Sequence, residues 1–220
     1  MIINGKIFLK ALFLIGILIK GSCVFAESVT WPPVMTFPMI TLSDLNYAGS
    51  GCPFGSLTSQ LSSGRDKVQL IFKDYKIIRA ISGNQGGSKN CNFVVSINVP
   101  TGYAISIQKI ELRGKMKLPR GAESIFSNEY AFAGHLGPIL SNKFNGPYDD
   151  SFKVEKNIAL QEQIFSPCGE TALLRVNSSF VVKNPSFDTA SVSIDGSSPR
   201  DRAGIIYSLR WKKCHSISRH

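Results

Sequence analysis

The stretch Asn92-Phe93-Val94-Val95-Ser96-Ile97-Asn98-Val99 decides the fold. Phe93, Val95, Ile97 and Val99 occupy every second position, with mostly polar residues between them. Successive side chains of a β-strand point to opposite faces, so a period of two is typical of a half-buried antiparallel strand. The same period recurs in three more stretches, at residues 68–73, 174–183 and 207–212.

Residues 103–118 carry a related pattern with a change of phase. Ile105 and Ile107 share one phase, and the opposite phase is taken by Ile110, Leu112, Met116 and Leu118. This switch predicts either a long strand with a β-bulge near Gln108–Lys109 or a strand that crosses between two sheets.

Turn-forming residues separate these runs, and no stretch has the period of an amphipathic helix. The chain is 43% hydrophobic, 10% aromatic and 18% charged, which is ordinary for a globular domain and excludes a disordered chain. We therefore expect an all-β fold, an antiparallel β-sandwich of two packed sheets. Residues 134–147 are expected to be rich in turns, and Asp149-Asp150 to form a solvated turn.

The N-terminus has the order of a secretory signal peptide. Lys6 and Lys10 flank the start of an apolar run at residues 11–19, and Val24 and Ala26 fit a small-residue cleavage site. This predicts cleavage after Ala26 and a secreted or periplasmic protein. An uncleaved anchor and lipid attachment at Cys23 are the alternatives.

The chain divides into four expected parts. Residues 1–26 form the signal peptide, and residues 27–47 form an extended proline-rich arm and a first strand. Residues 48–214 form a single β-sandwich domain, which two disulfides crosslink, and residues 215–220 form a flexible tail.

Four cysteines remain after the predicted cleavage: Cys52, Cys91, Cys168 and Cys214. An even number without a C-x-x-C pair, in an exported chain, favours two disulfides over a metal site. Three pairings are open. Cys52–Cys91 with Cys168–Cys214 is favoured, because each bond then closes a local loop.

The protein is basic. Its formal net charge is +10, and the 26 predicted signal residues carry three lysines and no acid, which leaves +7. Such a charge can hold the protein to an anionic polysaccharide or a membrane surface. The candidate contact for an anionic ligand is the basic C-terminal cluster of Arg200, Arg202, Arg210, Lys212 and Lys213.

The same C-terminal strand argues against specific nucleic-acid binding. Tyr207 and Trp211 alternate with Arg210 and Lys212, so the rings and the cations are expected on opposite faces. A single-strand binding surface needs exposed rings beside its cations.

No catalytic residue, cofactor or metal site is predicted. The sequence has no G-x-S-x-G motif, and His135 is the one histidine away from the C-terminal tail. A glycosidase would need two carboxylates across a cleft, which spacing in the sequence does not place.

Several short segments together resemble a known family. They are Gly49-Ser50-Gly51-Cys52-Pro53, Lys89-Asn90-Cys91, Pro100-Thr101-Gly102-Tyr103, Gly146-Pro147-Tyr148, Ser166-Pro167-Cys168-Gly169 and Arg210-Trp211-Lys212-Lys213-Cys214. The set is similar to exported fungal and bacterial proteins catalogued as domain of unknown function 4360, over about residues 40–214. The resemblance implies a small secreted β-rich domain with four matching cysteines, and it implies no activity.

These observations favour a non-catalytic exported domain that binds a surface or an extracellular ligand, either anionic or a polysaccharide. A structural or inhibitory secreted protein is one alternative. A secreted carbohydrate-active hydrolase is the other.

Overall fold

A computed structural model describes residues 39–79, 87–196 and 203–214 of the chain. These residues form thirteen strands in two antiparallel sheets, together with one short 3₁₀ turn, η1 (Leu160–Glu162). The six-stranded sheet contains β1 (Thr41–Ala48), β5 (Gly87–Asn98), β11 (Ala172–Lys183), β7 (Glu123–Phe132), β8 (His135–Leu136) and β9 (Leu140–Asn145). The seven-stranded sheet contains β2 (Leu57–Leu61), β3 (Lys67–Phe72), β13 (Gly204–Lys213), β6 (Tyr103–Leu118), β12 (Ala190–Ser193), β4 (Lys76–Arg79) and β10 (Tyr148–Asn157).

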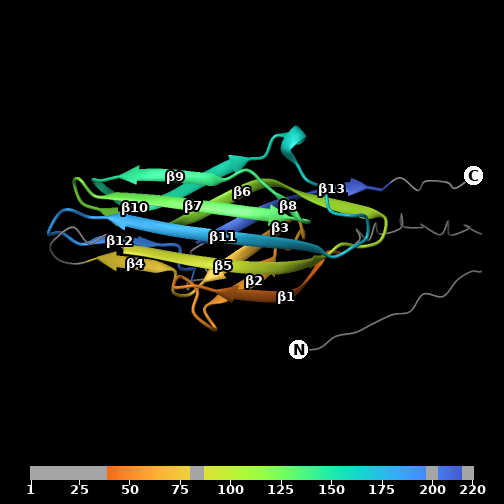
Figure 1. The fold of residues 1–220 in the computed structure, drawn as a ribbon, viewed down its shortest axis with the longest axis horizontal. Helices are drawn as coiled ribbons and strands as arrows, with labels where there is room; N and C mark the ends of the chain where they lie inside the picture. The colour runs from red at the N-terminus through yellow and green to blue at the C-terminus, as the bar shows by residue number, and fades with distance from the viewer. Residues whose placement is uncertain (1–38, 80–86, 197–202, 215–220) are drawn as a thin grey trace, which may run out of the picture. The chain divides into compact units, whose positions relative to one another are not determined.

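The two sheets pack face to face, which confirms the predicted β-sandwich. In the six-stranded sheet the order is β1-β5-β11-β7-β8, with β9 also paired to β7. Figure 1 shows β9, β7, β11, β5 and β1 side by side in one layer and β6, β13 and β3 in the other. Each layer leaves one face in the core and one face outside.

The core is built by the predicted alternation. Phe93, Val95 and Ile97 of β5 are buried, as are the alternate apolar residues of β3, β11 and β13. Full burial of such a side chain stabilises the fold by roughly 1.5–3 kcal/mol. Aromatic pairs join the layers, with 6.3 Å between the rings of Tyr130 and Tyr207.

The change of phase in residues 103–118 is a β-bulge in one long strand, β6. Along β13, Ser208 pairs with Lys109 but the next residue, Leu209, pairs with Ile107. Gln108 is therefore the extra residue. Its carbonyl oxygen accepts a hydrogen bond of 2.9 Å from the N–H of Ile158, and its side-chain N–H donates one of 3.1 Å to the carbonyl oxygen of Leu209.

Two predictions for the middle of the chain are wrong. Residues 134–147 contain β8 and β9, and Asp149 and Asp150 lie within β10 instead of in a turn. These edge strands are mostly polar, so their apolar alternation is weak. Tertiary packing stabilises these strands instead, since the ring of Phe144 in β9 lies 5.0 Å from that of Phe152 in β10.

Both favoured disulfides are present, and each lies where the chain passes between the sheets. Cys52, in the connection from β1 to β2, is bonded to Cys91 of β5, with a Cα–Cα distance of 5.5 Å. Cys168, just before β11, is bonded to Cys214 at the end of β13, with a Cα–Cα distance of 6.2 Å.

The predicted signal peptide and most of the proline-rich arm lie outside the described residues. In the ranges that the structure covers, no helix is long and apolar enough to cross a membrane.

Candidate functional site

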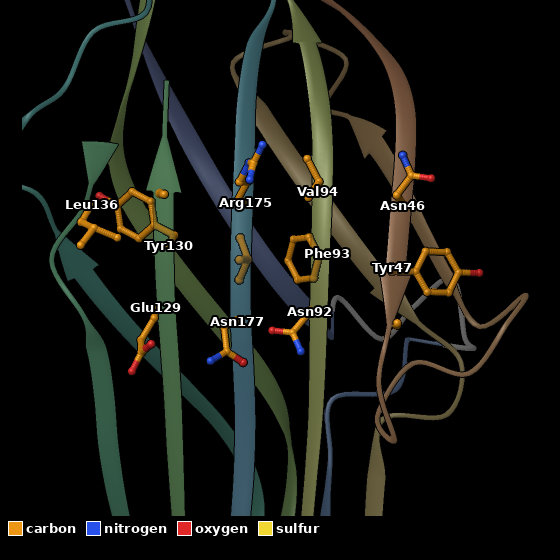
Figure 2. A pocket seen from close by; sticks show the side chains of 13 residues that line it. Asn46, Tyr47, Asn92, Phe93, Val94, Glu129, Tyr130, Leu136, Arg175 and Asn177 are labelled. Carbon is orange, nitrogen blue, oxygen red and sulfur yellow. The ribbon is translucent and has the colours of Figure 1, made fainter. Parts of the chain in front are cut away.

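The outer face of the six-stranded sheet carries a hollow of about 550 Å³. Its polar side chains come from four strands: Asn46 of β1, Asn92 of β5, Arg175 and Asn177 of β11, and Glu129 of β7. We call this site the amide hollow. Figure 2 shows these five side chains extending from neighbouring strands of one sheet.

The register of the sheet aligns these residues in two adjacent rows. One row runs across the strands through Asn46, Val94, Arg175, Ala131 and Leu136. The second row runs through Ala48, Asn92, Asn177 and Glu129. Because neighbouring strands lie about 4.8 Å apart, the second row spans about 14 Å.

The hydrogen-bonding groups in the two rows are unused. Among the residues that the structure describes, none of the five polar side chains has a hydrogen-bond or ion-pair partner. The asparagines on either side of the two rows already have hydrogen-bond partners. Asn98 donates to Thr41 and accepts from Thr171, and Asn90 accepts from Ser50 at 3.1 Å. In the amide hollow, unlike at Asn98 and Asn90, the asparagine side chains therefore remain available to a ligand.

One end of the amide hollow is apolar, because Leu136 of β8 is 86% exposed there. The neighbouring Tyr130 of β7 turns its ring into the core, towards Tyr207. Tyr130 itself is buried, which raises the pKa of its hydroxyl to about 12, with a smaller contribution from Glu162. Gly137 lets β8 approach closely, because a Cβ atom there would overlap the Tyr130 ring.

The predicted basic cluster lies on the other sheet. Arg200 and Arg202 lie outside the described residues, while Arg210, Lys212 and Lys213 are exposed on β13. As predicted, Tyr207 is in the core. Trp211 is half-buried, with its ring 5.7 Å from that of Tyr103.

The cations of this cluster do not converge on one point. Lys212 lies over the ring of Phe165, with its Nζ 5.2 Å from the ring centre. Arg210 instead lines a second hollow, of about 570 Å³, with Lys67 and Lys109. We call this second site the cationic hollow.

Two neighbouring carboxylates of the seven-stranded sheet belong to an ion-pair network. Glu155 lies 2.7 Å from Lys153 and 2.9 Å from Lys109. Glu111, whose side chain is nearly buried, contacts both lysines and also Arg113. Hydrogen bonds from Lys153 and then Lys109 lower the pKa of Glu155 to about 2. A general acid needs a raised pKa, so Glu155 does not suit that role in glycoside hydrolysis.

The two hollows also lack paired acids. The amide hollow contains one carboxylate, Glu129, and the cationic hollow contains one, Asp66. His135 is exposed on β8 and lines neither hollow. In residues 39–79, 87–196 and 203–214, no group of three His, Cys, Asp or Glu side chains could hold a metal ion.

Comparison with known proteins identifies relatives of this chain. The family model described as "Domain of unknown function (DUF4360)" matches residues 38–214. An uncharacterized secreted protein of Arthroderma benhamiae is 25% identical over 172 residues, which are 77% of this chain and 70% of that protein.

A solved structure, that of TmCBM61 in complex with β-1,4-galactotriose, is also similar. It has 9% identity and a TM-score of 0.27, and the match covers 78% of this chain and 90% of that one. A likeness of this size carries no argument about what this chain binds.

Proposed function

The chain belongs to the DUF4360 family, and we propose that it is an exported, non-catalytic domain that binds polysaccharide in the amide hollow. The contacts would come from Asn46, Asn92, Asn177, Glu129 and Arg175.

The observation that carries this proposal is the unused hydrogen-bonding capacity of the two rows. Each asparagine amide offers both donors and an acceptor, Glu129 offers acceptors, and Arg175 offers donors. A sugar presents hydroxyl groups that both donate and accept, so each could find a partner along the rows. The same side chains are exposed, so a ligand reaches them without any rearrangement of the sheet.

The apolar end of the amide hollow supports a sugar over a simple ion. Leu136, Ala131 and Val94 are the apolar members of the Asn46 row. Sugar rings have apolar C–H surface between their hydroxyl groups. Contact with that surface would add to the hydrogen bonds, as in most small-molecule sites.

An extracellular location is part of the proposal. Two disulfides persist in an oxidising compartment, which suits a protein released after cleavage following Ala26. The secreted relative supports the same location.

The test is binding of the mature chain to a panel of neutral polysaccharides, by co-sedimentation and then calorimetry. We expect Arg175→Ala and Asn177→Ala each to weaken binding about tenfold, the equivalent of one lost hydrogen bond. The control is Lys183→Ala, which removes a cation from the same strand and the same face, outside the amide hollow. The proposal fails if no neutral polysaccharide binds, or if Arg175→Ala binds as tightly as Lys183→Ala.

A further inference from the structure

The cationic hollow lies at the β-bulge of Gln108, which is one of its lining residues. Lys67, Ser208, Lys109 and Asn157 form one row across β3, β13, β6 and β10 on the outer face of the seven-stranded sheet. Just past the bulge, Arg210 lines the same hollow.

A segment of chain builds a wall along one side of this row. Residues 158–163 follow β10 and line the cationic hollow through Ile158, Ala159, Leu160 and Gln163. Gln163 holds this segment in place, because its side-chain N–H donates a 2.9 Å hydrogen bond to the carbonyl oxygen of Ile158. The hydrogen bond from Ile158 to the bulged residue Gln108 fixes the other end. The cations therefore border a concave site with a wall on one side. On a flat basic surface they would be open on all sides.

Two of the three cations are unpaired. Lys109 is paired with Glu155 and Glu111, at 2.9 and 3.4 Å. Neither Lys67 nor Arg210 has an ion-pair partner within the ranges that the structure covers. The one acid of the hollow, Asp66, accepts a 2.7 Å hydrogen bond from the hydroxyl of Ser62. The two unpaired cations outnumber this acid, so the hollow favours an anionic ligand.

Neutral polar groups stand beside these cations. Ser208 is only 5% exposed, and its hydroxyl lies in the row between Lys67 and Lys109. Asn157 is exposed and has no hydrogen-bond partner for its amide among the described residues. Hydroxyl and amide groups of this kind suit the hydroxyls of a sugar.

We propose that the cationic hollow binds the carboxylate of an acidic sugar residue in an extracellular polysaccharide. The guanidinium of Arg210 would hold the carboxylate through two parallel hydrogen bonds, a geometry that arginine provides and lysine does not. Lys67 would supply the second positive charge, and Ser208 and Asn157 would contact the ring hydroxyls. This site lies on the opposite sheet from the amide hollow and does not depend on the function proposed there.

The experiment measures binding of the mature chain to polygalacturonate, to a neutral galactan of similar length, and to vesicles containing phosphatidylglycerol. We expect polygalacturonate to bind, and its affinity to fall as salt rises from 50 to 300 mM, because salt screens exposed charges. Arg210→Ala and Lys67→Ala should each weaken binding at least tenfold, and Arg210→Lys should weaken it less than Arg210→Ala. Lys73→Ala, which removes an exposed cation just beyond the end of β3, should bind normally.

Three results would overturn the proposal. The first is equal binding of polygalacturonate by wild type and by Arg210→Ala, each shown to be folded by its thermal melting. The second is a stronger interaction with the vesicles than with polygalacturonate, which would indicate a membrane surface. The third is that Arg175→Ala loses polygalacturonate binding while Arg210→Ala keeps it. That result would place the acidic sugar in the amide hollow.

Discussion

The hydroxyl of Tyr207, in the seven-stranded sheet, donates a 3.0 Å hydrogen bond across the core to the side-chain oxygen Oδ1 of Asn128 in the six-stranded sheet. Both side chains are fully buried. Burial raises the pKa of Tyr207 well above its usual range, because an ionised ring would place a charge in the core. This bond is therefore a polar link across the core between the two sheets.

Tyr207→Phe should destabilise the fold by about 1–3 kcal/mol, because it leaves the oxygen of a buried amide without a donor. The amide nitrogen of Asn128 already lacks a partner among the described residues, so no second bond compensates. Tyr130→Phe is the control, since the hydroxyl of this neighbouring tyrosine makes no hydrogen bond within the described ranges. Urea unfolding with the disulfides intact measures both variants. Equal losses of stability in the two would contradict the expected role of this bond.

Loss of either disulfide should cost about 4 kcal/mol. The bonded cysteines are 39 and 46 residues apart, and the chain-entropy model gives nearly the same value for both. We expect Cys52→Ser/Cys91→Ser and Cys168→Ser/Cys214→Ser to lower the urea midpoint by similar amounts. Wild type in a reducing agent loses both disulfides, so its urea midpoint should fall further than that of either variant. A variant that unfolds at the wild-type midpoint would show that its disulfide contributes little.

Acid should weaken the fold through Glu155. Its folded pKa, about 2, lies below its ordinary value of 4.5, so the ionised form is favoured by folding. The resulting stability is fully present above about pH 4.5 and is lost as the pH falls towards 2. Glu155→Gln should therefore show a smaller change in unfolding midpoint between pH 5 and pH 2.5 than wild type. Glu129→Gln should keep the wild-type pH dependence, because Glu129 has no ion pair in the part of the chain described. An unchanged slope in Glu155→Gln would contradict this assignment.

Glycosylation should block the amide hollow. Asn177-Ser178-Ser179 is a sequon, and Asn177 is exposed in the second row of that site. The chain secreted from a eukaryotic host should carry a glycan at Asn177 and should lose neutral polysaccharide binding. Ser179→Ala removes the sequon while keeping Asn177, so binding should return. Mass spectrometry before and after glycan removal measures occupancy. Undiminished binding by the glycosylated chain would contradict the proposed site.

The alternation of single residues made β3, β5, β11 and β13 and their faces predictable, whereas the mostly polar β8, β9 and β10 were missed. The outward positions of Asn92, Arg175 and Asn177 follow from period two alone. The change of phase around Gln108 left a bulge and a crossing between sheets as alternatives, and the register of β6 with β13 shows the bulge. The disulfide pairing was also favoured correctly, because local loops are the simplest to close.

The amide hollow could not be predicted in the same way, because it depends on which strands are neighbours. Asn46, Glu129 and Arg175 are far apart in the sequence, and no local pattern shows that β1, β7 and β11 lie in one sheet. The basic cluster shows that closeness in sequence does not place residues at one site either. Arg210 and Lys212 are close in sequence, but the bulge and the wall formed by residues 158–163 place only Arg210 at the cationic hollow.

The amide hollow and the cationic hollow occupy the two outer faces of one sandwich, which point away from each other. A single copy can therefore be occupied on both sides at once without its ligands colliding. If both proposals hold, the protein is bivalent as a monomer. It would then crosslink a neutral chain to an acidic one, and mixing the two polymers with the protein should produce a gel or precipitate that neither polymer forms alone.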